Sequence, residues 1–381
     1  MATRRSTTEI ESLAELDELV AHGATTMHGW RVQGVDLRQR SEVLLRLDPA
    51  GAAFFGCPMA DDVAEAMRAG GALLFPPIPD LPFDAYPGAL YTPLQLYDRL
   101  TEATYEECLD GRVYAWTRSS DPRDATLTVA RALHDHLIED ALDDTLATLA
   151  DAGGAVVGVM GGHQTRRGDD GYAEAARLGR LLTRAGLTVA TGGGPGAMEA
   201  ANLGAYLSAA DEAVLAEALG HLSTVPTFVP SRTAWARVAL QVRARTPEGA
   251  ASIGIPTWFY GHEPPNLFAQ QIAKYFQNAL REAVLLQRCS GGVVFLPGAA
   301  GTVQEIFAAA SENYYAAFGL AAPKVLLGRA YWEHTLPAWP LLEALGRGRE
   351  MAGRIACVDT VDEALAWLTN ASSARRARRR S

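Results

Sequence analysis

The sequence predicts an α/β fold in which a doubly wound parallel sheet follows a small N-terminal α+β domain. Two observations carry this prediction. From residue 155 onward, short apolar runs alternate with segments of helical periodicity, and glycine-rich turns separate several of them. The apolar runs are continuous rather than alternating, which is typical of parallel strands covered by crossover helices on both faces. We therefore expect ligands to bind in the loops that follow the carboxyl ends of these strands.

The elements of this Rossmann-like domain, expected over residues 152–370, can be placed in order. The candidate strands are 155–160 (AVVGVM), 187–192 (LTVATG), 251–259 (ASIGIPTWF), 291–297 (GGVVFLP), 323–328 (PKVLLG) and 354–359 (RIACVD). Crossover helices are expected over 172–186, 266–286 and 302–319, where apolar residues recur at helical spacing. Asn266 is a candidate N-cap for the second of these helices.

The N-terminal third carries no motif that indicates a chemistry. Residues 1–122 contain short apolar runs and a proline-rich passage at 75–93, so we assign them to a small α+β domain of unknown role. Residues 123–151 have apolar positions at helical spacing and form a connecting helix. His134 and His136 point about 200° apart on such a helix. We expect one partly buried and one solvated histidine rather than a metal site.

Composition indicates a cytoplasmic protein. Of the 381 residues 48% are hydrophobic, yet there is no run of 18 uncharged apolar residues and no signal-peptide pattern, so no membrane association is expected. The four cysteines lack metal-binding spacing, so neither a metal nor a disulfide is expected. The net charge is −10 although five arginines lie in the last seven residues. We expect no specific nucleic-acid binding, and residues 371–381 are predicted to be a basic, disordered tail.

The first glycine-rich corner, 191–207 (TGGGPGAMEAANLGAYL), is a candidate phosphate site. It places Gly192, Gly193, Gly194 and Gly196 directly before a helical segment. Glycines let backbone amides converge, and the helix N-terminus adds partial positive charge, so no lysine is needed. The structural alternative is a tight turn that only packs the helix on the sheet.

The same corner must also be weighed as a dinucleotide-binding motif. Gly192, Gly194 and Ala197 match the pattern GxGxxA, and Asp211 and Glu212 follow at a suitable distance. The motif, however, follows the second strand of the domain rather than the first. The two acids also lie within a helical pattern instead of at the end of the next strand. We rank this interpretation below simple phosphate binding.

The second glycine-rich corner, 296–307 (LPGAAGTVQEIF), combines an anion site with an acid. Gly298, Gly301 and Thr302 lead into a helix whose amides and hydroxyl can bind the oxygens of an anion. Glu305 is expected on the first turn of this helix, on the side that faces the bound group. A glutamate at a helix N-terminus also complements the helix dipole without any catalytic role.

Two further loops could line the same site. After the first strand, Met160, Gly161 and His163 are candidate lining residues, and Arg166 or Arg167 could meet an anion. His262 and Glu263 follow the third strand. They could line the site or lie in a solvated loop, and both alternatives remain open. Base selectivity would depend on Met160, His163, His262 and Trp258, which are chosen by loop position alone.

The two corners together resemble the signatures GGGxxGxM, in its shorter GGGPGxM form, and PGGxGTxxE of the LONELY GUY (LOG) family, long labelled "lysine decarboxylase". The resemblance covers about residues 150 to 360. It implies hydrolysis of the N-glycosidic bond of a nucleoside 5′-monophosphate to free base and ribose 5-phosphate, without a cofactor, in a homodimer or higher homo-oligomer. It also implies Glu305 and Arg281 as catalytic residues, with the corner glycines and Thr302 holding the phosphate.

This chain departs from the family pattern at two points. Ala299 replaces the second glycine of PGG, which suits an extended backbone but not a positive φ. The segment FQNALRE (276–282) replaces the MHxRK motif of the compact LOG enzymes, which favours the larger bacterial branch over a cytokinin substrate.

Three other functions were weighed against phosphoribohydrolysis. Decarboxylation with pyridoxal phosphate needs a site lysine, whereas Lys274 lies in an apolar helical pattern and Lys324 opens a buried strand. A non-catalytic nucleotide sensor or carrier would need the corners but not the pair of Arg281 and Glu305. An NAD(P)-linked oxidoreductase would carry a bound dinucleotide.

Overall fold

The computed structural model describes residues 7–121, 123–151, 154–259, 263–316 and 321–380, and for 371–380 only the backbone. The chain divides into two compact units, residues 1–89 with 120–141 and residues 90–119 with 142–381. Helix α6 (Ala125–Asp151) contributes to both. None of the described helices combines the length and the apolar character that crossing a bilayer requires.

The N-terminal unit is a run of short parallel strands connected by helices. Its sheet has the order β1 (Thr8–Ile10), β2 (Trp30–Gln33), β3 (Ala53–Phe55) and β4 (Leu73–Phe75), and helices α1 (Leu13–Ala21), α2 (Ser41–Leu44) and α3 (Asp61–Ala69) connect them. Consecutive strands begin 22, 23 and 20 residues apart. Ile10, Val32 and Phe54 are aligned across the sheet and buried in one core. Each strand thus packs on its chain neighbour, as in a short solenoid.

The large unit contains the predicted doubly wound sheet. The strand order is β11-β10-β9-β5-β6-β7-β8, and every pair is parallel. The bounds are β5 Ala155–Met160, β6 Leu187–Thr191, β7 Ile253–Gly254, β8 Gln271–Ile272, β9 Gly292–Phe295, β10 Lys324–Leu327 and β11 Ile355–Val358. The predicted fold class, α/β with a parallel sheet, is confirmed.

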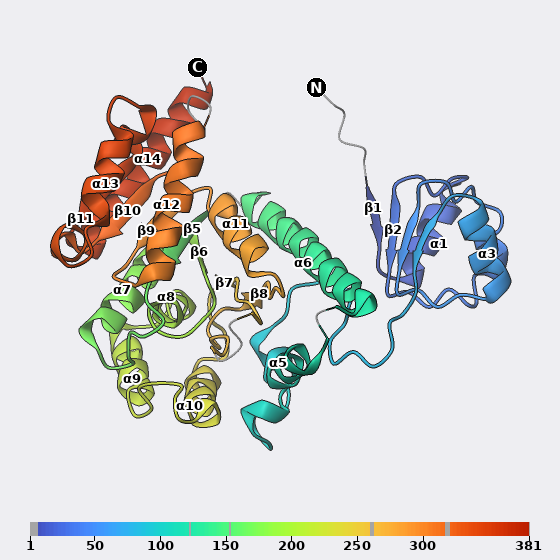
Figure 1. Cartoon of the computed structure of the whole chain (residues 1–381), viewed down its shortest axis with the longest axis horizontal. Coiled ribbons are helices and arrows are strands. Elements are labelled where there is room, and N and C mark those ends of the chain that lie inside the picture. Colours follow the sequence, from blue (N-terminus) through green and yellow to red (C-terminus); the bar gives the residue numbers. More distant parts are fainter. Residues whose placement is uncertain (1–6, 122, 152–153, 260–262, 317–320, 381) are drawn as a thin grey trace. The chain divides into compact units, whose positions relative to one another are not determined.

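Helices pack in two groups around this sheet. The helices are α7 (Asp170–Arg184), α8 (Ala197–Tyr206), α9 (Glu212–Leu222), α10 (Arg232–Arg245), α11 (Asn278–Arg288), α12 (Ala300–Tyr315), α13 (Ala338–Gly346) and α14 (Val361–Arg380). Helix α7 packs on α8 and α14, whereas α12 packs on α11 and α13 (Figure 1). The unit also contains helix α5 (Leu109–Ser119) and four segments of three to five residues, α4 (Pro93–Leu96), η1 (Tyr105–Glu107), η2 (Tyr331–Thr335) and η3 (Glu350–Arg354). The arginine-rich end, predicted to be disordered, lies within the bounds of α14.

The helix predicted over 266–286 is wrong in its first half. Residues 271–272 form strand β8, and helix α11 begins only at Asn278. The apolar residues that suggested a helical face, among them Leu267, Phe268 and Ala273, are all buried in an extended segment. Asn266 caps no helix. Its Oδ1 accepts hydrogen bonds from the Phe268 and Ala269 amides at 3.0 Å each, which fixes a tight turn instead.

Residues 90–119, which the sequence assigns to the N-terminal domain, pack in the large unit. Tyr91 and Ile272 exchange both backbone hydrogen bonds, at 3.0 and 2.8 Å. Asp110 is buried and accepts hydrogen bonds from Lys274 Nζ, from Trp258 Nε1 at 2.9 Å and from Tyr105 OH at 2.6 Å. Burial lowers the pKa of Lys274, and Asp110 opposes that effect. Lys274 is therefore an internal ion-pair partner and not a residue of the predicted helix.

We expect Asp110→Ala to lower the free energy of unfolding of the protein by about 3–5 kcal/mol, because it leaves the buried Lys274 ammonium without its counter-ion. Urea unfolding followed by circular dichroism measures this. The control is Asp362→Ala, which removes the exposed partner of Arg177 and should leave stability nearly unchanged. A similar loss in both variants would contradict the structural role of the buried pair.

Candidate functional site

The strand order reverses between β5 and β9, and this reversal creates the main crevice of the large unit. From β5 the chain proceeds outward through β6, β7 and β8, and then returns to the other side of β5 as β9. The loops after β5 and β9 leave in opposite directions, so a gap opens at the carboxyl ends of these strands. Backbone hydrogen bonds join the two loops, from Leu296 N to Met160 O (2.8 Å) and from Gly162 N to Pro297 O (3.1 Å).

A cavity of about 450 Å³ lies at this position. It is lined by Gly161, Gly162, His163, Gln164, Thr165, Met198, Glu263, Arg281, Glu282, Pro297, Gly298, Ala299, Gly301, Thr302, Glu305 and Tyr331. We call it the Glu305 cavity. It unites the second glycine-rich corner with both predicted catalytic residues, which lie on α11 and α12.

The Arg281 guanidinium is incompletely paired. Arg281 Nη1 lies 3.7 Å from Glu305 Oε1, and the two side chains are only 12% and 15% exposed. This distance permits ionic attraction but is too long for a hydrogen bond. Arg281 Nε is also buried and has no hydrogen-bond partner among the described residues. The guanidinium therefore retains donor capacity for an anionic or hydroxyl-bearing ligand.

Glu305 is an acid that titrates near neutral pH. Burial raises the pKa of Glu305 from 4.5 to about 7, while Arg281 opposes the rise and Glu282 adds to it. A carboxyl with such a pKa can accept or release a proton under ordinary cellular conditions. The predicted first-turn position is wrong, because α12 begins at Ala300 and Glu305 is its sixth residue. The acid thus lies one turn deeper than the helix N-terminus.

The N-terminus of α12 forms one wall of the cavity. Its N-cap is Ala299, which provides no side-chain hydrogen bond, so the first amides of the helix are not capped by a side chain. Ala299 has φ −101°, a negative value that a residue with a Cβ can adopt, so glycine is not required at this position. Gly298 must lack a side chain, because a Cβ there would lie 2.2 Å from Thr302 Oγ1. Tyr331 OH donates to Gly298 O at 2.7 Å and holds the corner.

The glycines of the first glycine-rich corner do not line the Glu305 cavity. Gly192, Gly193 and Gly194 are buried and are not among the lining residues, while Gly196 faces a neighbouring cavity. Gly193 and Gly196 have φ of +71° and +75°, which strongly favours glycine. A Cβ at Gly192 would lie 2.8 Å from Met198 Sδ, so this glycine leaves room for the Met198 side chain, which lines the cavity.

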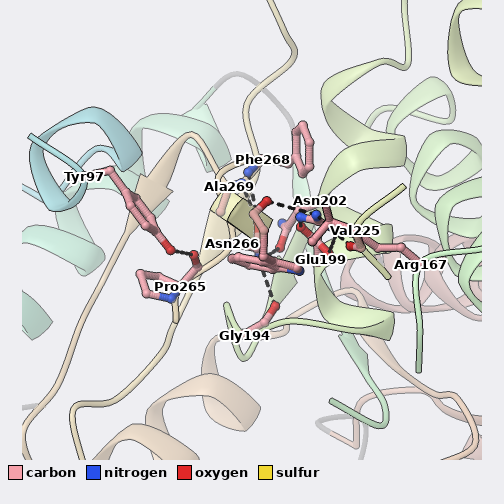
Figure 2. Close-up of polar contacts among 11 residues, drawn as sticks. Tyr97, Arg167, Gly194, Glu199, Asn202, Val225, Pro265, Asn266, Phe268 and Ala269 are labelled. Atoms are coloured by element: carbon pink, nitrogen blue, oxygen red, sulfur yellow. Dashed lines mark hydrogen bonds and ion pairs between the residues drawn. The ribbon is translucent and has the colours of Figure 1, made fainter. Parts of the chain in front are cut away.

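Asn266 fixes the first corner from the side, a role that its sequence context did not indicate. Its backbone N donates to Gly193 O (2.8 Å), and its Nδ2 lies 3.3 Å from Gly194 O and 3.0 Å from Asn202 Oδ1. Figure 2 shows Asn266 between the Gly194 turn and Asn202. Asn202 in turn accepts from Thr191 Oγ1 and donates to Ser252, so the network is buried and continuous. The corner is rigid because its carbonyls are already bonded.

The remaining candidates divide between the cavity and the core. His163 and Glu263 line the cavity, with His163 Nδ1 3.6 Å from Glu263 Oε1. Met160 and Trp258 are buried in the core, with 1% and 2% of their surface exposed. His262 lies outside the described residues.

The expectation that Arg167 could meet an anion is wrong, because its charge is neutralised inside the protein. Arg167 is 2% exposed, and its Nε donates to Glu199 Oε2 at 3.0 Å. Its Nη1 donates to Trp235 O at 3.0 Å. Arg166 is exposed and does not line the Glu305 cavity. Neither lysine of the chain lines it either, since both are buried elsewhere, and the described residues contain no cluster of His, Cys, Asp and Glu that could hold a metal.

One family model matches part of this unit. Residues 154–211 match the model of the SLOG cluster4 family (LDcluster4). The matched segment contains the first glycine-rich corner but not the second. No curated protein matches the chain.

Two solved structures are among those similar to this chain. A molybdenum cofactor binding protein from the phototrophic bacterium Rippkaea orientalis is 16% identical over 57% of this chain and 96% of its own, with a TM-score of 0.36. The Moco carrier protein from Chlamydomonas reinhardtii is 18% identical over 57% of this chain and 98% of its own, with a TM-score of 0.33.

Substitution of Glu305 by glutamine is expected to stabilise the protein at pH 8 by an amount on the order of 3 kcal/mol and to change little at pH 4. The folded-state pKa of Glu305 is raised, so its favourable contribution is complete below pH 4.5 and is lost as pH rises through about 7. Glutamine is neutral at both pH values. Urea unfolding at pH 4 and pH 8 measures the difference. The exposed Glu174→Gln serves as control, and a Glu305→Gln protein that is less stable than wild type at pH 8 would contradict the raised pKa.

Proposed function

We propose that the protein binds a small phosphorylated ligand of the nucleotide type in the Glu305 cavity. One observation carries this proposal: an N-terminus of α12 without a side-chain cap and an incompletely bonded arginine line the same cavity. Helix amides and an arginine are the groups that most often hold phosphate oxygens in proteins. The Thr302 hydroxyl in the same wall can add a further hydrogen bond.

The acids of the cavity favour a ligand that also carries hydroxyl groups. Glu263, Glu282 and Glu305 line the cavity together with Arg281. Ionised carboxylates accept hydrogen bonds but repel further negative charge, so a bare polyphosphate is a poor fit. A sugar phosphate satisfies both halves of the site, because its phosphate meets the α12 amides and its hydroxyls donate to the carboxylates. The simplest function is therefore to hold a nucleotide intact, as a carrier or sensor.

Hydrolysis of the N-glycosidic bond is the second candidate, favoured by the pair of Glu305 and Arg281. A pure carrier does not need a carboxyl whose pKa lies near 7 beside a guanidinium. In this reaction Glu305 orients a water molecule and accepts its proton while the water oxygen bonds to C1′ of the ribose. The bond from C1′ to the base breaks, and the base leaves with the electron pair and takes up a proton. A nearby carboxylate stabilises the positive charge that develops on the sugar.

Incubation of the purified protein with AMP, GMP, CMP, UMP and IMP distinguishes these functions. Isothermal titration calorimetry measures binding, and chromatography measures free base and ribose 5-phosphate. Tight binding without cleavage supports the carrier or sensor function, whereas release of base supports the hydrolase. If none of the five nucleotides binds and none is cleaved, the proposal is overturned.

Arg281→Ala is expected to weaken nucleotide binding by about 10- to 100-fold, because a charge-assisted hydrogen bond to phosphate or ribose is lost. Arg288→Ala is the matched control on the same helix, since Arg288 pairs with Asp143 and does not line the cavity. Calorimetry with the best ligand of the panel gives both dissociation constants. Equal affinity in wild type and Arg281→Ala would remove Arg281 from the site.

If the protein cleaves a nucleotide, Glu305→Ala is expected to lower kcat by about 10²- to 10⁴-fold, because the general base is removed. The dissociation constant of the nucleotide should change by no more than a few fold. Single-turnover assays with saturating protein separate the two effects. Undiminished cleavage would exclude Glu305 as the base.

A further inference from the structure

A second cavity of about 340 Å³ lies directly beside the Glu305 cavity. His163, Gln164 and Thr165 line both cavities and form the wall between them. Pro226, Phe228 and the α10 residue Trp235 line the second cavity but not the first. A ligand anchored in one cavity can therefore extend over the shared wall into the other.

The second cavity is mainly apolar, although three charged residues form part of its lining, the exposed Arg166 and the buried Arg167 and Glu199. Arg167 and Glu199 are both buried and hydrogen-bonded to each other, so the pair presents no net charge. The Arg167 guanidinium lies 4.4 Å from the centroid of the Trp235 ring, which packs the two together. Figure 2 shows Arg167 reaching Glu199 beside Val225. Arg167 is therefore part of a neutral, rigid floor rather than a second anion site.

Phe228 gives this cavity a surface on which a planar ring can stack. Its side chain is half-buried, and it belongs to the loop between α9 and α10. A phenyl ring, two prolines (Pro195 and Pro226) and the balanced pair of Arg167 and Glu199 favour a flat group, and the Arg166 guanidinium in the same lining can meet a polar edge of that group. Gln164 and His163 at the shared wall supply donors and acceptors for the polar edge of such a ring.

We propose that the second cavity binds the heteroaromatic base of the ligand whose sugar phosphate occupies the Glu305 cavity. This inference rests on the proposed function and extends it, because it assigns base recognition to Phe228 and the wall residues. The phosphate end is held by the α12 corner and Arg281, the ribose lies at the wall, and the base lies over Phe228. Sequence reasoning did not point to this loop, since it contains no glycine-rich or charged motif.

The test compares a nucleotide with its sugar phosphate alone. Dissociation constants for AMP, GMP, CMP and UMP and for ribose 5-phosphate are measured by calorimetry with wild type, Phe228→Ala, Phe228→Tyr and Arg281→Ala. Stacking of a base on an aromatic side chain is lost in Phe228→Ala, so the affinity for the best nucleotide should fall by about 5- to 100-fold. Ribose 5-phosphate should bind Phe228→Ala as it binds wild type. Arg281→Ala should weaken both ligands.

Two controls keep the result interpretable. Phe228→Tyr retains the ring and should bind the nucleotide within about threefold of wild type. Leu341→Ala removes an exposed apolar side chain of α13 that lines neither cavity, and should change nothing.

Each outcome of this comparison has a distinct meaning. If Phe228→Ala binds the nucleotide as tightly as wild type while Arg281→Ala weakens it, base recognition by the second cavity is wrong and the phosphate site stands. An equal loss of ribose 5-phosphate affinity in Phe228→Ala also overturns the inference. If wild type binds neither the nucleotides nor ribose 5-phosphate, the proposed function is wrong, and the inference, which rests on it, is wrong as well.

Discussion

The parallel pairing of β5 with β9 is the constraint on which the rest of the site depends. The two strands are more than a hundred residues apart in the chain, yet their hydrogen bonds bring the loops after Met160 and Phe295 to one crevice. Because the chain leaves these strands in opposite directions, a crevice is expected at their carboxyl ends. The helices that flank it, α11 and α12, pack on each other and so bring Arg281 to Glu305. The position of the pair follows from the topology of the sheet.

Buried, fully bonded polar groups fix the backbone around the site. The first glycine-rich corner uses its carbonyls to bind Asn266, and Asn266 continues the network to Asn202. In the lining of the second cavity, Arg167 and Glu199 are hydrogen-bonded to each other, so their opposite charges are balanced. Buried polar groups of this kind are costly when unsatisfied, so each one restricts the backbone to a single arrangement. In contrast, Arg281 keeps an unbonded donor and Glu305 keeps a raised pKa, and both lie at the cavity.

Local patterns in the sequence predicted the strands of the central sheet and the residues of the second corner. In the large unit, continuous apolar runs mark the buried parallel strands, and β5, β6, β9, β10 and β11 all lie within the predicted runs. The resemblance to the LOG motifs grouped Gly298, Arg281 and Glu305, and these residues line one cavity. The predictions that were wrong concern residues whose structure depends on contacts with residues distant in sequence. The segment after Asn266 has helical periodicity, yet burial on all sides makes it extended. Arg167 looked available for a ligand because its partner Glu199 lies 32 residues away.

A crystal structure of the protein soaked with ribose 5-phosphate tests the central claim most directly. The account predicts phosphate oxygens within hydrogen-bonding distance of the first amides of α12, and ribose hydroxyls beside Glu305 and Arg281. Phosphate bound outside the Glu305 cavity, or a cavity that stays empty at saturating ligand, would contradict it.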